Sequence, residues 1–501
     1  MAIITDTLRA VMALDEAAPV IDHKDVWYTW GELNAQVDAI SDLLTALDIP
    51  AGGRVGVLLH NRPGHVAAIL SVLASDRCLV TLNPLYPDET LAGDIASLAV
   101  PVVVGEASDL ARPGIRTALE ASGAAIIEID PLLGATVLKT KGRGELPNEA
   151  GSQAIAIEML TSGTTGKPKR VPLTRAAFDA SFAAVAKYEK SRELTPQVKL
   201  RDNTTLIINP VTHIGGIYGV IGALMAGRRI CLVERFSVEN WAHAVVRHRP
   251  KVAPGVPAAL RMILEANLPA DTFSSLSAII SGTAPLDPAI VDEFLTRYDL
   301  PILGNYGATE FAGAIAGWSL KDFRLHWSDK RGAAGRLHHD VTARIVDAES
   351  GEPVAAGVEG LLELKAPQLG DADSWRRTTD RAVLDADRFL FIKGRADNAI
   401  VRGGFKIHPD DVVRVMEQHP AIREAAVVGV PDSRLGEVPV AAIILADGAT
   451  LPPVADLKAY LKDKLLPYQT PVRFLAVRDL PRTASMKPAV VQIRKLFETS
   501  P

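Results

Sequence analysis

The sequence predicts an α/β protein: a large N-terminal domain of doubly wound sheets with an antiparallel β subdomain, then a small α+β C-terminal domain. Three observations carry this prediction. Short apolar runs alternate with helical patterns as far as Leu303, which is typical of parallel sheets covered by helices. Beyond about Arg336 the runs are short and alternating, which favours antiparallel strands. A chain of 501 residues is also too long for a single core.

The N-terminal part supplies most of the expected alternation. Helix starts are expected after Thr174 and Ser237, because these residue types are favoured N-caps. The polar stretch 138–152 is expected to be a surface connection. The predicted helices cover 33–44 and 66–73, and the predicted strands cover 54–59, 78–82, 100–104, 124–129, 154–160, 205–209, 229–233, 276–280 and 301–303.

The C-terminal part has a different texture. A compact domain of usual size is expected after the antiparallel strands. The predicted strands are 342–346, 360–364, 389–392, 424–430 and 438–446, and the predicted helices are 410–418 and 454–465. The expected domains are therefore 1–396 and 397–501.

Composition narrows the class of protein. Hydrophobic residues make up 48% and charged residues 23% of the chain, as in ordinary soluble proteins. The net charge of −5 argues against a nucleic-acid partner. Two cysteines, Cys78 and Cys231, suit a reducing compartment. Neither a signal peptide nor a run of about 18 apolar residues is present, so we expect a cytoplasmic enzyme without stable membrane insertion; a homodimer is left open.

One polar stretch stands out, Thr161-Ser-Gly-Thr-Thr-Gly-Lys-Pro-Lys169. It follows a buried-strand pattern and precedes a helical one, so we expect it to join a strand to a helix. Glycines let backbone N–H groups curl around a polyanion, hydroxyls add donors, and Lys167 and Lys169 add charge. A solvated polar turn is the alternative, and the unusual residue order disfavours it. The spacing of the glycines excludes a Walker A loop.

This loop resembles the phosphate loop of the adenylate-forming superfamily, which holds acyl-CoA synthetases, peptide-synthetase adenylation domains and firefly luciferase. The segment Tyr306-Gly-Ala-Thr-Glu310 matches a second signature of that family. The resemblance implies that Tyr306 stacks on adenine, Thr309 reaches the phosphates and Glu310 binds Mg²⁺. The nucleotide-binding residues that it implies are Thr161, Ser162, Gly163, Thr164, Thr165, Gly166, Lys167, Asn305, Tyr306, Gly307, Thr309, Asp380, Arg395 and Lys487.

Further matches lie towards the C-terminus. The resemblance implies a ribose-binding role for Asp380, assisted by Arg395, and a hinge at Asp397. The segment 481–487 matches the C-terminal signature with the adenylation lysine, Lys487. Thr379 and Met486 stand where the family usually has glycine, and Pro488 stands where it has an aliphatic residue.

The resemblance also places two substrates. Gly403 and Gly404 would lie along the channel for the pantetheine arm of coenzyme A. The acyl pocket would be bordered by small residues, with room for an aromatic or branched acid. His213 is equally well explained as a structural histidine held by backbone groups. The pocket residues implied are His213, Gly282, Thr283, Gly304 and Ala308, with Asn305 beside them.

The function implied is ATP-dependent activation of a small carboxylic acid as an acyl adenylate, followed by transfer to coenzyme A. ATP, Mg²⁺ and coenzyme A would be required. Lys487, Thr165, Glu310 and His213 are the expected catalytic residues. Two alternatives stay open: an adenylating enzyme that passes the acyl group to an amine or a carrier protein, and a non-catalytic binding protein with this fold.

Overall fold

A computed structural model describes residues 3–140, 155–161, 169–188, 198–371, 373–402, 405–432, 434–462, 464–483 and 486–498. These residues belong to two compact units. The first contains Met1–Thr161, Pro168–Thr342 and Lys365–Ser374, and the second contains chiefly Ala343–Leu364 and Trp375–Pro501. The expected division at 396/397 differs from this partition and stays a prediction.

The first unit begins with a seven-stranded sheet in the order β7-β6-β5-β3-β4-β8-β9. Its five central strands are parallel, and β7 and β9 run antiparallel at the two edges. The doubly wound arrangement expected from the sequence is confirmed for this sheet. Its strands are β3 (Arg54–Leu58), β4 (Cys78–Leu82), β5 (Val102–Glu106), β6 (Ala125–Ile129), β7 (Val137–Thr140), β8 (Ile155–Thr161) and β9 (Lys169–Thr174).

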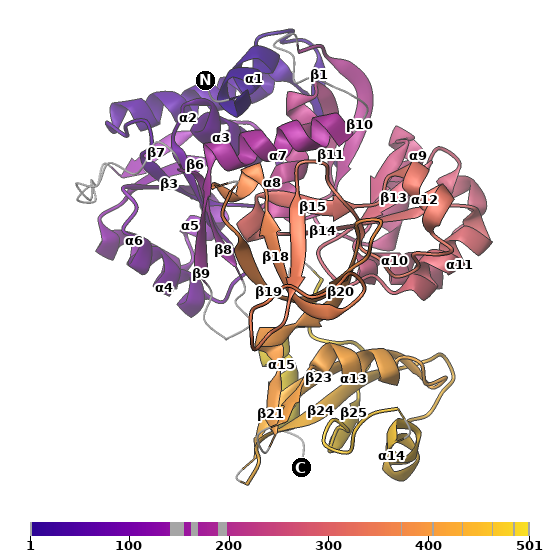
Figure 1. Ribbon diagram of the computed structural model, residues 1–501. Coiled ribbons are helices and arrows are strands. Elements are labelled where there is room, and N and C mark those ends of the chain that lie inside the picture. The colour runs from indigo at the N-terminus through magenta and orange to yellow at the C-terminus, as the bar shows by residue number, and fades with distance from the viewer. Residues whose placement is uncertain are drawn as a thin grey trace. The chain divides into compact units, whose positions relative to one another are not determined.

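Helices cover both faces of this sheet. Apolar side chains of α2 and α3 share one core with one face, while those of α4 and α6 share another core with the opposite face. Figure 1 shows these two helix pairs on opposite sides of the strands. The helices are α1 (Ile3–Met12), α2 (Trp30–Ala46), α3 (Pro63–Ala74), α4 (Asp88–Leu98), α5 (Ala107–Leu110), α6 (Pro113–Ser122) and α7 (Arg175–Tyr188).

A second sheet of the first unit has the order β10-β11-β1-β2, with β1 parallel to β11. Ser237 caps α9 by accepting a hydrogen bond from the N–H of Asn240, as predicted. The elements here are β1 (Pro19–His23), β2 (Val26–Thr29), β10 (Arg201–Ile207), α8 (Ile214–Met225), β11 (Arg228–Leu232) and α9 (Val238–His248).

The first unit continues with strands that change from parallel to antiparallel pairing. Strand β14 pairs parallel with β13 through its first half and antiparallel with β15 through its second half. The elements are β12 (Val252–Pro254), α10 (Pro257–Glu265), η1 (Ala270–Phe273), β13 (Ala278–Ser281), α11 (Pro288–Tyr298), β14 (Ile302–Ala308), η2 (Thr309–Phe311), β15 (Gly313–Gly317), α12 (Leu320–His326), β16 (Gly335–Leu337) and η3 (Pro367–Leu369).

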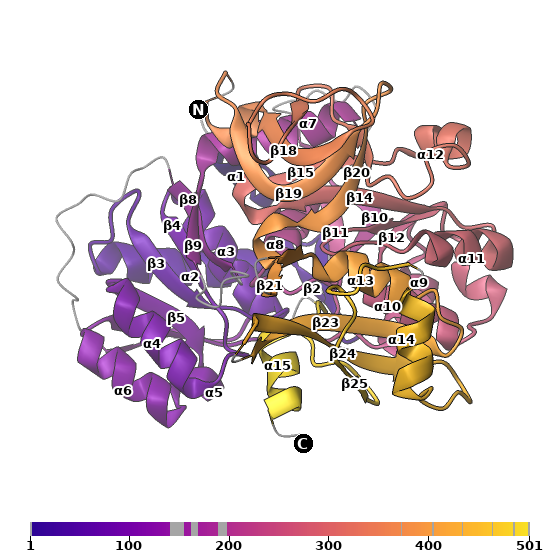
Figure 2. The ribbon, with the colours of Figure 1, turned by 60° about the horizontal axis from the view of Figure 1, so that its bottom comes forward.

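The second unit contains antiparallel strands and an α+β part, as expected. In the latter, side chains of β23 and β24 alternate between two cores. One core contains residues of α13 and α14 and the other contains residues of α15, so the helices cover opposite faces (Figure 2). The elements are β17 (Thr342–Val346), β18 (Glu359–Lys365), β19 (Arg376–Leu384), β20 (Phe389–Arg395), η4 (Ala396–Asn398), β21 (Ile400–Arg402), β22 (Phe405–Ile407), α13 (Pro409–Met416), β23 (Ile422–Asp432), β24 (Gly436–Leu445), α14 (Val454–Lys462), β25 (Arg473–Ala476) and α15 (Val490–Glu498).

Two expectations about the strands near the signatures are wrong. Strand β9 lies between the phosphate loop and α7, so the loop does not join a strand directly to a helix; Thr174 still caps the helix through the N–H of Ala177. The expected strand 301–303 continues to Ala308. Pro172 argues against a strand in the sequence, but it is tolerated in β9 because β9 is an edge strand.

Candidate active site

The flanks of the phosphate loop are firmly held. Thr161 and Lys169 are partners in the β8–β9 ladder, so the loop connects the two strands of a hairpin. The predicted residues Ser162, Gly163, Thr164, Thr165, Gly166 and Lys167 lie outside the described residues.

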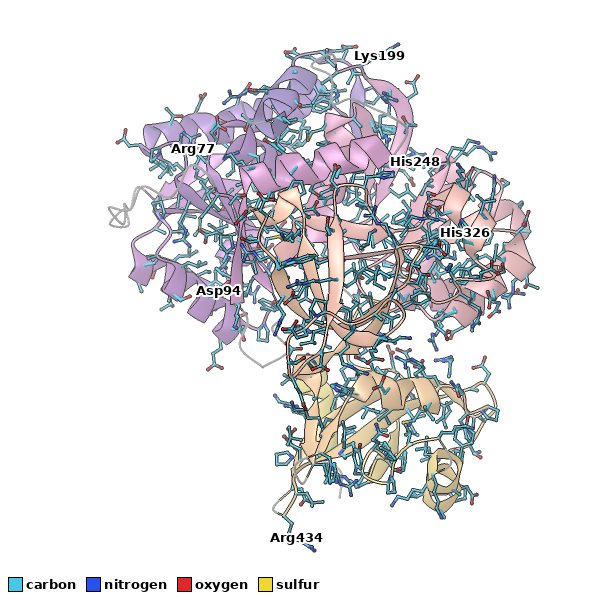
Figure 3. The ribbon with its side chains drawn as sticks, viewed as in Figure 1. Arg77, Asp94, Lys199, His248, His326 and Arg434 are labelled. Atoms are coloured by element: carbon cyan, nitrogen blue, oxygen red, sulfur yellow. The ribbon has the colours of Figure 1, made fainter. Side chains whose placement is uncertain are left out.

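Two half-buried ion pairs hold these flanks to their neighbours. Arg54 on β3 makes two hydrogen bonds to the Glu158 carboxylate on β8, at 3.0 and 2.7 Å. Arg170 on β9 donates to Asp94 of α4 at 2.7 Å, and Asp94 is labelled in Figure 3. The hairpin that presents the loop is therefore a fixed part of the sheet.

The second signature forms the turn between β14 and β15. Ala308 and Gly313 are partners in this antiparallel ladder, and Glu310 lies in the short η2 helix between them. A Cβ atom on Gly307 would lie 2.4 Å from the carbonyl oxygen of Gly313, so only glycine fits. Glu310 is exposed, and its carboxylate has no hydrogen-bond or ion-pair partner among the described residues. An exposed, unused carboxylate is a suitable ligand for Mg²⁺.

Tyr306 on β14 lies beside an aromatic side chain of the η2 helix that follows it. Its ring packs edge-on against Phe311, with centroids 6.1 Å apart. Tyr306 is half-buried. This geometry is compatible with the predicted stacking on adenine, which stays a prediction.

The predicted pocket residues of β13 and β14 are close neighbours. Ser281 and Gly304 are partners in the parallel ladder. A Cβ atom on Gly282 would lie 2.1 Å from Oδ1 of Asn305, so the absence of a side chain at Gly282 admits the Asn305 carboxamide. Thr283, next to Gly282, has a left-handed φ of 72°, an uncommon conformation for a residue with a Cβ atom.

His213 is the N-cap residue of α8 and is half-buried. Its carbonyl accepts hydrogen bonds from Gly216 and Ile217, which starts the helix. Helix α8 contacts β15, and Tyr218 on α8 is hydrogen-bonded to Ser181 on α7 at 3.2 Å. The helix that starts at His213 thus lies against the strand that follows the Glu310 turn.

Sequence reasoning missed two buried hydroxyls beside the predicted pocket residues. The Oγ1 atom of Thr212 and the Oγ atom of Ser281 are buried without a hydrogen-bond partner among the described residues. Such atoms are uncommon in folded proteins because an unsatisfied buried polar group is destabilising. In the sequence, these two residues could have been noticed as pocket candidates only because they directly precede His213 and Gly282.

The second unit brings the predicted ribose and hinge residues together. Asp380 on β19 is the ladder partner of Arg395 on β20. The Arg395 guanidinium makes two hydrogen bonds to the Asp397 carboxylate, at 2.8 and 2.7 Å. Thr379, which replaces a glycine of the family pattern, lies inside β19, where no special backbone conformation is required.

Lys487 lies in a tight turn of the second unit. The Thr483 N–H donates to the Lys487 carbonyl at 2.8 Å, and the Lys487 N–H donates to Thr483 Oγ1 at 3.2 Å. Arg482 anchors the turn through two hydrogen bonds to Glu424, at 2.9 and 2.7 Å. Met486 has a left-handed φ of 63°, which explains why glycine suits this position in the family pattern. Gly403 and Gly404 lie outside the described residues.

Two other polar clusters have ligand-type side chains, but their carboxylates already accept hydrogen bonds from neighbouring side chains. His60, Glu106 and Asp109 form one. Burial alone would raise the pKa of Glu106, but hydrogen bonds from His65, Ser108 and Arg62 hold it well below its ordinary value. These donors occupy the carboxylate, so we assign this cluster a structural role.

The other cluster joins β1, β11 and α9 through Asp22, Cys231 and His248, the last of which is labelled in Figure 3. Asp22 accepts from Nε of Arg247 at 3.0 Å. Burial raises the pKa of the Cys231 thiol to about 12, and that of Cys78 likewise, so both thiols are protonated at neutral pH. This cluster fastens α9 to the sheet.

Comparison with known proteins identifies the class that this fold and these signatures define. The chain matches the AMP-binding enzyme family over residues 9–371 and the AMP-binding enzyme C-terminal domain over residues 414–487. The chain therefore belongs to the AMP-binding, or adenylate-forming, enzyme family, and the family predicted from the sequence is confirmed.

Particular members of the family resemble the whole chain. A 2-succinylbenzoate–CoA ligase from Bacillus cereus (strain ATCC 14579) is 26% identical over 98% of this chain and 97% of its own. The solved o-succinylbenzoate CoA synthetase from Bacillus subtilis, in complex with an acyl-adenylate intermediate, is 24% identical with a TM-score of 0.77, and 98% of each chain is covered. An amide bond synthetase from Marinactinospora thermotolerans is 26% identical with a TM-score of 0.78, over 99% of this chain and all of that one.

Among the described residues, no helix combines the length and apolar character needed to cross a membrane.

Proposed function

We propose that this protein is an AMP-forming acid–thiol ligase that converts a carboxylic acid into its coenzyme A thioester. The expected class of enzyme is confirmed by a CoA ligase relative that matches nearly the whole chain. The observation that carries the proposal to particular residues is the exposed Glu310 carboxylate, which is unpartnered among the described residues and lies in the η2 helix that follows Tyr306 and the end of β14.

In the first half-reaction, a carboxylate oxygen of the acid attacks the α-phosphorus of ATP and pyrophosphate leaves. Mg²⁺ held by Glu310 would neutralise charge on the phosphate oxygens. The phosphate loop with Thr165 and Lys167 would bind the leaving pyrophosphate, and Lys487 would stabilise the charge on the α-phosphate and the attacking carboxylate. Catalysis in this step is positioning and charge stabilisation.

Other residues would hold the substrates in place. Tyr306 and Thr309 would bind the adenine and phosphates, and Asp380 and Arg395 the ribose. The pocket of His213, Gly282, Thr283, Gly304, Asn305 and Ala308 would hold the acid. Small side chains at most of these positions suit an aromatic or branched acid.

In the second half-reaction, the coenzyme A thiolate attacks the acyl carbonyl carbon and AMP leaves. We propose that residues 397–501 turn about Asp397 between the two steps, which removes Lys487 and presents Gly403 and Gly404 to the pantetheine arm. The hydrogen bonds between Arg395 and Asp397 would stabilise one setting of this hinge.

Pyrophosphate release tests the proposal, measured with a panel of carboxylic acids, with and without coenzyme A. We expect acid-dependent release and a thioester product when coenzyme A is present. Absence of acid-dependent release with any acid would exclude adenylation.

A second candidate, amide formation, is favoured by the likeness to the amide bond synthetase over the whole chain. In that reaction an amine nitrogen attacks the acyl adenylate in place of the thiolate. Turnover that ignores coenzyme A but rises with added amine would replace the ligase proposal by this one.

A further inference from the structure

The side chain of Asn61 links the ends of three strands in the first unit. It follows β3 and is only 5% exposed. Its Nδ2 donates to the carbonyl oxygens of Asn209, at 3.0 Å, and Val233, at 3.2 Å, which follow β10 and β11. Its Oδ1 accepts from the N–H of Val211 at 2.9 Å. A carboxamide makes at most about four hydrogen bonds, so three of them are used here.

These bonds hold the loop that leads into α8. Pro210 has no N–H group, so the backbone of this loop cannot form a regular ladder, and Asn61 supplies the acceptor that Val211 requires. The carbonyl of Pro210 then accepts from the N–H of His213 at 2.9 Å. The position of His213 at the helix N-terminus follows from the position of Val211.

The next residue, Arg62, holds the neighbouring chain segment instead. Its Nε donates to Glu234 at 2.6 Å and its NH1 group donates to both oxygens of Glu106, at 2.9 and 2.7 Å. Arg62 therefore fixes the ends of β5 and β11, whereas Asn61 is the side chain that reaches the loop before α8.

This loop also contains a polar group that the fold does not use. The Thr212 hydroxyl is buried and has no hydrogen-bond partner among the described residues. An unsatisfied buried hydroxyl is destabilising, and a ligand that accepts or donates a hydrogen bond there would remove the penalty. Helix α8, which starts at the end of this loop, contacts β15 beyond the Glu310 turn.

We infer that Asn61 is a positioning residue for the carboxylic acid: it fixes the loop of Thr212 and His213 as a wall of the acyl pocket. The inference rests on the proposed function. Removing the carboxamide takes one hydrogen-bond partner from the N–H of Val211 and from the carbonyl oxygens of Asn209 and Val233. The loop therefore shifts and the acid binds less well. The residues proposed to bind ATP lie outside this loop, so we expect the binding of ATP not to depend on it.

The kinetic test uses Asn61→Ala. Asn61→Ser, which keeps a polar atom at this position, is the second variant in case Asn61→Ala does not fold. We expect the KM for the acid to rise on the order of tenfold, while kcat and the KM for ATP change by less than about twofold. The reason is that the lost hydrogen bonds support only the loop beside the acid. Equal changes in both KM values, or an unchanged acid KM, would overturn the inference.

Gln36→Ala is the matched control. Gln36 is also a buried carboxamide, 2% exposed, but its Nε2 donates to the carbonyl of Asp130, away from this loop. It should lower the melting temperature and leave the acid KM unchanged. The same rise in acid KM in this control would show that general destabilisation, and not positioning, is responsible.

Hydrogen exchange separates this inference from the proposed function. Amide exchange in peptides covering 209–217 should be faster in Asn61→Ala than in the wild type and unchanged in Gln36→Ala, whether or not an acid is turned over. If Asn61→Ala exchanges faster but the wild type shows no acid-dependent activity, the proposed function and the acyl pocket are refuted, while the role of Asn61 in fixing the loop is retained. Unchanged exchange in Asn61→Ala would refute the role of Asn61 in fixing the loop.

Discussion

The turn that carries Glu310 and the turn that carries Lys487 reach their shapes by different means. The first is closed by the antiparallel register of β14 and β15, and backbone packing leaves no space for a Cβ atom on Gly307. The second is closed by bonds between Thr483 and Lys487, and it contains Met486 in a left-handed conformation. A left-handed residue with a Cβ atom costs about 1–2 kcal/mol.

This difference bears on what each group would do. A metal ligand is needed in one place throughout the reaction, and a position set by sheet register suits that requirement. A lysine that acts in just one of the two half-reactions requires a turn that keeps its shape while the second unit moves. The Lys487 turn has its own hydrogen bonds and an anchor on β23 through Arg482 and Glu424, so it keeps its shape within the second unit.

The largest effect is expected for Lys487→Ala. Loss of one preorganised charge or donor at a transition state typically lowers the rate on the order of 10²–10³-fold. Adenylation, measured as acid-dependent pyrophosphate release, should fall by at least that much. Thioester formation from pre-made acyl-AMP and coenzyme A should be nearly unchanged.

Lys458→Ala, which removes an exposed lysine from α14, should leave both steps unchanged. If Lys487→Ala adenylates normally, or loses both steps equally, the assignment of Lys487 to the first half-reaction alone is wrong.

Next in size is Glu310→Gln. The amide is a weaker ligand for a hard cation, so the Mg²⁺ concentration for half-maximal adenylation should rise on the order of tenfold. The melting temperature should not change, because the carboxylate has no partner among the described residues. The exposed Glu89 gives the control variant, Glu89→Gln. An unchanged Mg²⁺ titration would place the metal elsewhere.

A third change tests the rigid turn through its packing. Gly307→Ala should lower the free energy of unfolding by about 1–3 kcal/mol, because the new methyl group meets the Gly313 carbonyl. Gly93→Ala is the control: nothing lies within 4 Å of its Cβ position in α4, so it should stabilise by about 0.5–1 kcal/mol. Denaturant unfolding measures both. A neutral Gly307→Ala would mean that the β14–β15 turn adjusts easily.

The smallest effect is expected at the strained turn. Met486→Gly removes the left-handed penalty of about 1–2 kcal/mol but adds about 0.5–1 kcal/mol of backbone entropy to the unfolded chain. The net result should be a stabilisation of at most about 1.5 kcal/mol in denaturant unfolding. Met486→Val should destabilise, because a β-branched residue suits this conformation least. Destabilisation by glycine would show that the Met486 side chain matters more than the strain.

The sequence by itself determined the family and many of the helices and strands in their order along the chain. Strands 78–82 and 342–346 lie where the apolar runs place them, because a buried strand needs a continuous or alternating set of apolar residues. The helix caps at Thr174 and Ser237 were also visible, since capping depends on a few adjacent residues. Signatures such as Tyr306–Glu310 are local in the same sense.

Only the tertiary structure decided which distant groups meet. Strand β9 exists because β8 offers it an edge, although Pro172 argues against a strand locally. Gly282 matters because Asn305 lies against it, and Asn61 matters because Val211 and two carbonyl groups lie within its reach. The left-handed Met486 follows from how its turn closes. Each of these depends on atoms brought together by folding, and no pattern of neighbouring residues encodes that proximity.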